Sequence, residues 1–312
     1  MDNLLLAFWK AQRGKSRKTD VCEFRKNLLD NIEFMRQELI EKNVSLGDYH
    51  YFTIHDPKKR VICAASFRER VLHHAIINVC GDYFERYQIY DSYACRLGKG
   101  QTAAIPRAQL FSRRFPWFVK FDIHKYFDTI DHSIVKQLLR RLFKDCDVLR
   151  LLDRIIDTYS VTDGKGIPIG NLTSQYFANM YLGKADHFIK RDLKCGGFVR
   201  YMDDFICFAQ SKEEANRLKK RVEEFLYEQL KLELNPVIIN KTQHGFPFLG
   251  FRVLPNSLRL LKNTKRRFLD KIKQADARQM QSLLAFVNRA ETFSLRMRLF
   301  YSGCSSRRHE PG

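Results

Sequence analysis

Apolar residues recur every three or four positions in several stretches of the chain, which is the spacing of one face of a helix. Residues 21–42 carry one such stripe, and residues 66–83 and 133–159 show the same pattern. Ser211 is followed three positions later by Glu214, which is the arrangement of a capping box at the start of a helix. The predicted helices are one beginning within residues 1–9, then 21–42, 66–83, helices within 133–159, one starting at 211, 263–273 and 278–289.

Strand patterns lie between these helices. Residues 49–64 alternate as a hairpin does, with the turn at Asp56-Pro57, and residues 117–123 read as a buried strand. Two further apolar runs flank Asp203-Asp204 and predict a tight hairpin over residues 198–209. The order strand, helix, hairpin, helix, strand predicts an α+β fold, in which an antiparallel sheet has helices on one face.

The paired carboxylates Asp203 and Asp204 are unusual for a hairpin turn, because two adjacent like charges repel each other. A divalent cation would offset that charge. Mg²⁺ takes carboxylate oxygens, keeps some water and uses substrate phosphates for its remaining ligands. An ordinary turn that contains aspartate is the alternative.

A third carboxylate, Asp122, interrupts an apolar strand near its end. A lone buried carboxylate is costly unless it is paired or ligates a metal. Asp128 and Asp131 follow, and we expect them to cap the helix that begins near residues 132–133. Three carboxylates on neighbouring strands suit two-metal phosphoryl transfer, in which the metals activate a 3′-hydroxyl and stabilise an in-line transition state.

These segments resemble the reverse transcriptases over roughly residues 55–255. The YxDD box of that family is matched by Tyr201, Met202, Asp203 and Asp204, and Phe121-Asp122 matches its first catalytic aspartate. The resemblance implies a right-hand polymerase fold. It divides the chain into an N-terminal helical extension (1–48), fingers and palm (49–255), and a short basic helical thumb with a tail (256–312). We expect neither an RNase H nor an endonuclease domain.

The same resemblance assigns the site. It implies that two Mg²⁺ ions, for which Mn²⁺ can substitute, are held by Asp122, Ile123, Asp203 and Asp204. Phe127 would exclude a 2′-hydroxyl and so favour deoxynucleotides. Residues 248–253 resemble the primer grip.

Two cations are also assigned by the resemblance. Residues 93–100 resemble the fingers motif, which casts Arg96 as a clamp on the incoming triphosphate. Lys241 falls where the family often has a lysine near the leaving pyrophosphate. A solvated loop arginine and a surface lysine are the alternatives.

Residues 166–182 indicate which group of reverse transcriptases the chain resembles most. Most reverse transcriptases carry Gln-Gly, three residues, then Ser-Pro, whereas this chain has Ile169-Gly170 and then Ser174-Gln175. That combination resembles the reverse transcriptases of diversity-generating retroelements from bacteria and phages. Such enzymes copy a template-repeat RNA into cDNA with errors at adenines for mutagenic retrohoming. The resemblance implies a small basic accessory variability protein as partner.

The loss of glutamine has a physical consequence. A glutamine can hydrogen-bond to the nascent base pair, and Ile169 cannot, so discrimination can fall by roughly 1–3 kcal/mol. We hypothesise that Ile169, with Gln175, helps loosen selection opposite adenine. Both residues, together with Gly170, are predicted to bind the nucleotide. A simple packed turn residue is the alternative for Ile169. For the whole chain, the alternative is a retron-type or phage-defence reverse transcriptase without adenine mutagenesis.

Charge agrees with a nucleic-acid partner. The 312 residues include 55 basic and 35 acidic side chains, a formal net charge of +20. This balance predicts binding to template RNA, an RNA/DNA duplex and deoxynucleoside triphosphates, with steep salt dependence. No apolar stretch of about 20 residues predicts a membrane span. The 8 cysteines are scattered without a Cys-x-x-Cys pair, which disfavours zinc and suits the cytoplasm of a bacterial or phage-infected cell.

Overall fold

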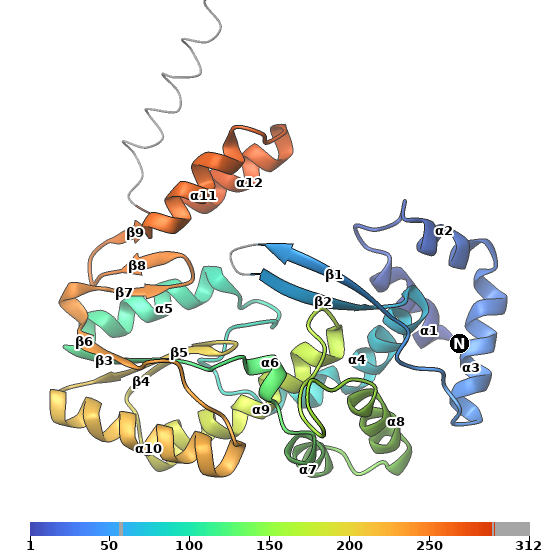
Figure 1. The fold of residues 1–312 in the computed structure, drawn as a ribbon, viewed down its shortest axis with the longest axis horizontal. Helices are drawn as coiled ribbons and strands as arrows, with labels where there is room; N and C mark the ends of the chain where they lie inside the picture. The colour runs from blue at the N-terminus through green and yellow to red at the C-terminus, as the bar shows by residue number, and fades with distance from the viewer. Residues whose placement is uncertain (56–58, 289, 291–312) are drawn as a thin grey trace, which may run out of the picture.

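The structure is a computed structural model that describes residues 1–55, 59–288 and 290 (Figure 1). Its α+β architecture confirms the predicted fold class. The predicted turn at Asp56-Pro57, the end of the last predicted helix at Arg289 and the predicted tail lie outside the described residues. Among the described residues, no helix is long and apolar enough to cross a membrane.

A four-stranded sheet forms the centre of the fold. Its strands are β3 (Trp117–Asp122), β4 (Gly197–Tyr201), β5 (Asp204–Ala209) and β6 (Ile238–Lys241), in the order β4-β5-β3-β6. All three pairings are antiparallel, as predicted.

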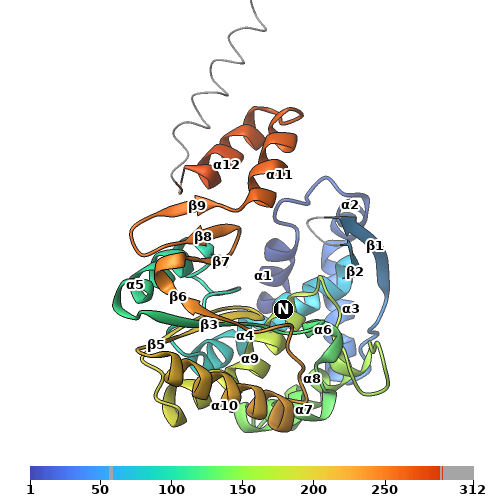
Figure 2. The same cartoon turned by 60° about the vertical axis from the view of Figure 1, so that its left-hand side comes forward.

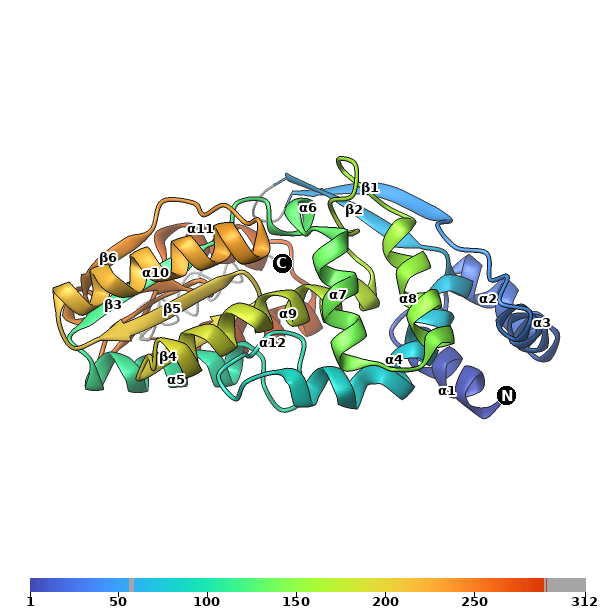
Figure 3. The same cartoon turned by 90° about the horizontal axis from the view of Figure 1, so that it is seen from below.

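Helices lie on both faces of this sheet, not on one face only. On one face run α9 (Leu172–His187) and α10 (Lys212–Leu230), as the view from below shows (Figure 3). The other face carries α5 (Gln101–Arg114) and a small sheet of β7 (Phe246–Phe248), β8 (Phe251–Val253) and β9 (Leu258–Leu260). The physical reason is that β3 carries apolar side chains on both of its faces. Val119 and Phe121 enter one core, and Phe118 enters a second core with residues of α5.

The N-terminal part of the chain contributes three helices, a β-hairpin and the long helix that follows it. Strands β1 (Tyr49–His55) and β2 (Lys59–Ala65) pair antiparallel, as predicted. They precede α4 (Phe67–Tyr87), whose N-cap Ser66 accepts a hydrogen bond from the Glu69 amide. Helix α1 (Asp2–Ala11) packs along α4.

The single helix predicted for residues 21–42 is wrong in one respect. Two helices, α2 (Thr19–Lys26) and α3 (Leu28–Ile40), meet at Asn27, whose φ of −118° and ψ of 47° are not helical. The Asn31 side chain donates to the Phe24 carbonyl at 3.0 Å and so satisfies part of the broken end. The apolar stripe continues across the break, which is why spacing alone did not reveal it.

Short helices connect the remaining parts. After β3 come α6 (Tyr126–Thr129), α7 (His132–Leu142) and α8 (Cys146–Asp157), and a π-helical turn (Phe188–Asp192) follows α9. A 3-10 turn (Thr242–His244) follows β6. At the C-terminal end, α11 (Lys262–Ile272) and α12 (Ala277–Val287) lie together above the small sheet (Figure 2).

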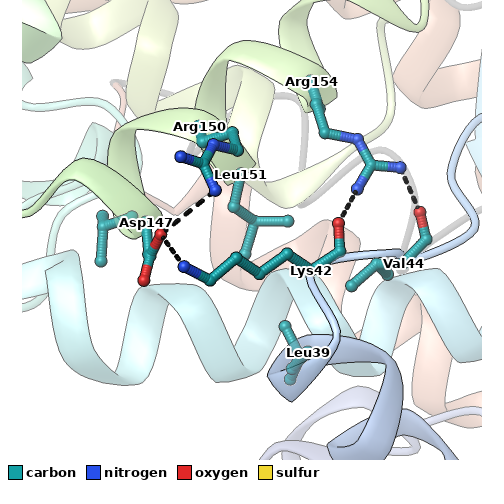
Figure 4. A pocket seen from close by; sticks show the side chains of 8 residues that line it. Leu39, Lys42, Val44, Asp147, Arg150, Leu151 and Arg154 are labelled. Carbon is teal, nitrogen blue, oxygen red and sulfur yellow. Dashed lines mark hydrogen bonds and ion pairs between the residues drawn. The ribbon is translucent and has the colours of Figure 1, made fainter.

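A pocket of about 210 Å³ lies where the chain leaves α3 and meets α8 (Figure 4). Arg154 of α8 donates to the Lys42 and Val44 carbonyls at 3.0 and 2.5 Å, and Lys42 pairs with Asp147 at 2.7 Å. These contacts fasten the N-terminal helices to α8. None of the three predicted catalytic carboxylates lines this pocket.

Candidate active site

The Asp203-Asp204 segment forms the tight hairpin that was predicted. Strand β4 ends at Tyr201 and β5 begins at Asp204, and these two residues are partners in the register. Met202 and Asp203 therefore make the turn. Met202 has a φ of 57°, a left-handed conformation that is uncommon for a residue with a Cβ.

Asp122 is the last residue of β3, and its register partner on β5 is Asp204. Directly opposite residues of an antiparallel pair have Cβ atoms roughly 4.5–5.5 Å apart, and like charges at such positions are destabilising. Asp203 is the next residue along the hairpin. The sheet thus brings all three carboxylates to one end of β3, although they come from segments some 80 residues apart.

Two polar side chains hold these carboxylates. The Lys120 ammonium forms an ion pair with Asp204 Oδ1. The Asn235 amide donates to Asp122 Oδ2 at 2.7 Å, and the Asn235 backbone N–H donates to the Asp122 carbonyl at 2.8 Å. The same Asn235 side chain reaches the Ile123 carbonyl at 3.4 Å, so that carbonyl faces the site as well.

Neither Lys120 nor Asn235 was predicted as a site residue. A signal for Lys120 existed, because residues two apart on a strand share a face and Lys120 precedes Asp122 by two. Asn235 stands before Pro236, a turn signal that says nothing about which strand the turn will meet.

The electrostatics of the site favour a cation. Burial raises the pKa of Asp203, and the neighbouring Asp122 charge adds to that shift. Burial likewise raises the pKa of Asp204 to about 6, against the opposing effect of Lys120. Crowded carboxylates whose ionised forms are disfavoured by burial and by one another are candidates for a functional site.

The donor set fits Mg²⁺, because three carboxylates and the Ile123 carbonyl are the oxygen ligands that this ion accepts. As their side chains lie, however, no three acidic, histidine or cysteine groups among the described residues stand close enough to enclose an ion. In this arrangement Lys120 contacts Asp204 and Asn235 contacts Asp122.

Three residues predicted to bind nucleotide, Phe127, Ile169 and Gly170, lie in segments that contact one another or the β1–β2 hairpin. Phe127 is half-buried on α6, and its carbonyl accepts from the Ile167 amide at 2.9 Å. The Ile169 carbonyl accepts from the Cys63 amide of β2 at 2.8 Å. Gly170 has a φ of 120°, and a Cβ there would come within 2.8 Å of Ile62 Cγ2. Residues 167–170 thus join the β1–β2 hairpin to α6, the short helix that follows β3.

Comparison with known proteins decides the family. Residues 54–253 match the family described as reverse transcriptase (RNA-dependent DNA polymerase), which is more than half of the chain. The chain belongs to the reverse transcriptase family. Protein YkfC of Escherichia coli is 22% identical to this reverse transcriptase over 72% of the chain and 71% of its own length.

Other relatives are longer than the matched region. A putative COX1/OXI3 intron 2 protein of Saccharomyces cerevisiae is 21% identical over 80% of this chain, which spans only 37% of that relative. The group II intron-encoded protein LtrA of Lactococcus lactis is 24% identical, over 44% of this chain and 35% of its own length. Apo telomerase from Candida tropicalis has a TM-score of 0.54 at 12% identity, with 76% of this chain and 54% of the other covered, and so shows the same fold.

Both cations that were predicted to bind nucleotide in this reverse transcriptase have partners within the fold. Arg96 is 8% exposed; its guanidinium pairs with Glu85 at 2.6 Å and donates to the Ile89 and Ser92 carbonyls, both at 2.7 Å. Lys241 lies opposite Trp117, five residues along β3 from Asp122, or roughly 16 Å at the rise of a strand. The structure does not bring Lys241 to the carboxylates, and it occupies the donors of Arg96 locally.

The remaining predicted residues differ in their burial and in their hydrogen bonds. Gln175 is half-buried in the first turn of α9, and Tyr201 is half-buried beside the turn. Asp131 is the N-cap of α7, as predicted: its Oδ1 accepts from the Ser133 and Ile134 amides at 3.0 and 3.2 Å. Asp128 was also expected to cap α7, but it lies inside α6 and does not do so.

Proposed function

We propose that this chain is an RNA-directed DNA polymerase that extends a primer by two-metal nucleotidyl transfer. The register that sets Asp122 opposite Asp204, with Asp203 in the adjoining turn, carries the proposal. Membership in the reverse transcriptase family supports it. The divisions proposed with it are an extension (1–48), fingers and palm (49–255) and a thumb (256–312).

The roles follow from the contacts. Asp122, Asp203, Asp204 and the Ile123 carbonyl would hold two Mg²⁺ ions, which supply Lewis acidity to the 3′-hydroxyl and to the transferred phosphorus. Lys120 and Asn235 orient Asp204 and Asp122 before the substrates enter. Phe127 would lie under the sugar and exclude a 2′-hydroxyl, as the resemblance to the family implies.

Arg60 of β2 is the cation that we assign to the incoming triphosphate. It is exposed on the β1–β2 hairpin, and its charge lowers the pKa of Asp203, so it lies within electrostatic reach of the site. Arg96, which was expected in this role, has its donors occupied. Replacing Arg60 with alanine should raise KM for deoxynucleotides, whereas Arg96→Ala should act mainly on stability.

Within this activity we propose the diversity-generating role. Ile169 stands where most family members have glutamine, and Ser174-Gln175 replaces Ser-Pro. The enzyme would copy a template-repeat RNA with errors at adenines and work with a small basic accessory variability protein. The alternative is a retron-type or phage-defence reverse transcriptase, which makes cDNA without that bias.

The deciding experiment is primer extension on an RNA template with Mg²⁺ and deoxynucleotides, followed by sequencing of the products. It is run with and without a co-expressed accessory protein, and with Asp203→Ala as the inactive control. Errors concentrated at template adenines support the diversity-generating role. Faithful cDNA leaves the polymerase and favours the alternative, and absence of cDNA in every condition contradicts the proposal.

A variant at position 169 tests whether Ile169 contributes to the errors at adenine. Ile169→Gln restores the amide, which can hydrogen-bond near the nascent base pair, and should lower the adenine error rate. Ile169→Leu is the matched control, because it keeps an apolar side chain of equal size. An unchanged error rate in Ile169→Gln would remove Ile169 from the explanation.

A further inference from the structure

A fully buried ion pair lies directly behind the catalytic hairpin. Arg200 of β4 and Asp186 of α9 have side chains that are each only 1% exposed. The guanidinium meets the carboxylate in the forked geometry, with Nε–Oδ1 at 2.8 Å and Nη2–Oδ2 at 2.6 Å. A buried pair of this kind contributes little stability relative to an apolar pair of the same size, because both charges lose their water. Its hydrogen bonds outside the pair therefore point to its role.

Those further bonds lead to the turn. Arg200 Nη1 donates to the Met202 carbonyl at 2.9 Å and to Asn179 Oδ1 at 3.1 Å. Met202 is the left-handed residue between Tyr201 and Asp203. A non-glycine residue keeps such a conformation only where its surroundings hold it. The guanidinium provides that hold from two residues away.

Arg200 is itself fixed to other parts of the fold. Its amide donates to the Asp91 carbonyl, and its carbonyl accepts from the Tyr93 amide, both at 2.9 Å. Nη2 reaches the Gln88 side chain, which directly follows α4, at 3.2 Å. One side chain thus joins the end of α4, helix α9 and the carbonyl of the turn.

We propose that Arg200, anchored by Asp186, is a positioning residue that sets where the Asp203 carboxylate stands relative to Asp122 and Asp204. It acts through the Met202 carbonyl and touches neither nucleotide nor metal. This inference rests on the proposed polymerase function. It predicts weaker metal binding and slower chemistry when the pair is removed, with nucleotide affinity unchanged.

The test uses a balanced double variant, Arg200→Met with Asp186→Leu, because removing one partner alone would leave a buried charge. Arg200→Lys is the second variant: it keeps the charge beside Asp186, but a single ammonium lacks the fork that also reaches Met202. Arg140→Met is the matched control, since it removes the same charge from the exposed pair with Asp153.

The readouts are the affinity for Mn²⁺, measured by electron paramagnetic resonance without turnover, and kcat and KM for deoxynucleotide in primer extension. Loss of a residue that orients a ligand weakens metal affinity or activity by about 10- to 100-fold. We expect that loss in Mn²⁺ affinity and in kcat for the double variant, with KM within about twofold. Arg200→Lys should fall between it and the wild type, and Arg140→Met should match the wild type.

A folded double variant with wild-type Mn²⁺ affinity and kcat overturns the inference, and so does a rise in KM at constant kcat. If circular dichroism shows that the double variant does not fold, Arg200→Lys decides by the same criteria. A wild type that binds Mn²⁺ in an Asp203-dependent manner but makes no cDNA refutes the polymerase proposal, while the Mn²⁺ comparison still decides the role of Arg200.

Discussion

The two ends of strand β3 differ in how well their polar groups are matched. At the Trp117 end, the Thr242 amide and hydroxyl donate to the Pro116 and Phe115 carbonyls at 2.9 and 2.8 Å, and Lys241 lies over the Trp117 ring at 5.8 Å. At the other end, Asp122 and Asp204 are directly opposed. At the Trp117 end the polar groups have hydrogen-bond or cation–ring partners. At the Asp122 end two like charges face each other, which is unfavourable in an antiparallel pair.

The difference teaches where stability and function separate. Both ends share the same apolar interior, so the core does not account for the opposed carboxylates. Proteins tend to break local rules at functional sites and to compensate elsewhere. Here Lys120 pairs with Asp204 and Asn235 donates to Asp122, and these contacts offset part of the repulsion between the two carboxylates.

The largest expected effect is at the carboxylate end. Asp203→Asn keeps the shape of the side chain but removes a metal ligand and its charge, so primer extension should fall by about 1,000-fold or more. Folding raises the pKa of Asp203, so its ionised form at pH 7 opposes the folded state. The thermal midpoint of Asp203→Asn should therefore equal or exceed that of the wild type, as calorimetry would show. A variant that is inactive because it is unfolded would contradict the comparison.

The second prediction concerns the sugar. Phe127→Ala should open space for a 2′-hydroxyl and reduce the preference for deoxynucleotides over ribonucleotides by about 10- to 100-fold. The ratio of the two kcat/KM values measures this preference. Phe127→Tyr is the control, since it keeps the ring. An unchanged ratio in Phe127→Ala would separate Phe127 from sugar selection.

The third prediction concerns pH. Because the pKa of Asp204 is raised to about 6, protonation below that pH should weaken Mn²⁺ binding by up to about tenfold per pH unit. The stability term has the opposite sign: a raised folded pKa means that Asp204 contributes more to the free energy of unfolding as pH falls from about 6 towards 3.8. Mn²⁺ titrations between pH 5 and 8, paired with denaturant unfolding, would show both trends. Metal affinity that is constant down to pH 5 would contradict the assignment.

Asp131 supplies the contrasting carboxylate, one whose hydrogen bonds are satisfied. Burial alone would raise its pKa, but bonds from Lys231, Ser133 and Ile134 outweigh that effect and lower it. Asp131→Ala should reduce the free energy of unfolding by about 1–2 kcal/mol through loss of the cap. The contribution of Asp131 should be present above its unfolded pKa and lost as pH falls through the lower folded value. Asp131→Asn, which keeps the cap, should lose less in urea unfolding, and equal losses would mean that the cap is unimportant.

Local signals explain what the sequence could predict. The two apolar runs on either side of the adjacent like charges identified the hairpin at Asp203, and an apolar run interrupted by a carboxylate identified Asp122. Capping by Asp131 was equally local. What joins these parts is not local: the register of β3 with β5, the approach of Asn235 after α10, and the burial of Arg200 against Asp186 all depend on pairing between distant segments.

The same limit applies to the two predicted cations, Arg96 and Lys241. Arg96 and Lys241 were assigned by alignment with a motif, and a motif does not state which partners a side chain will find. Glu85 takes the guanidinium of Arg96, and the register of β6 sets Lys241 beside Trp117. Asn27 divides a continuous apolar stripe, because its backbone geometry leaves no trace in the spacing.

The smallest expected effect is at the Trp117 end of β3, where Lys241 lies. If Lys241 lies roughly 16 Å along the strand from Asp122, its side chain is too short to reach a leaving pyrophosphate. Lys241→Ala should then change kcat by less than about twofold, and the lost contact with Trp117 should cost at most about 1 kcal/mol, as at other exposed cation–ring pairs. Single-turnover extension with excess pyrophosphate is the sensitive assay, because a residue on the leaving group would alter the reverse reaction as well. A tenfold loss in both directions would show that Lys241 does act on the leaving group and that the two ends of the strand are not separate in function.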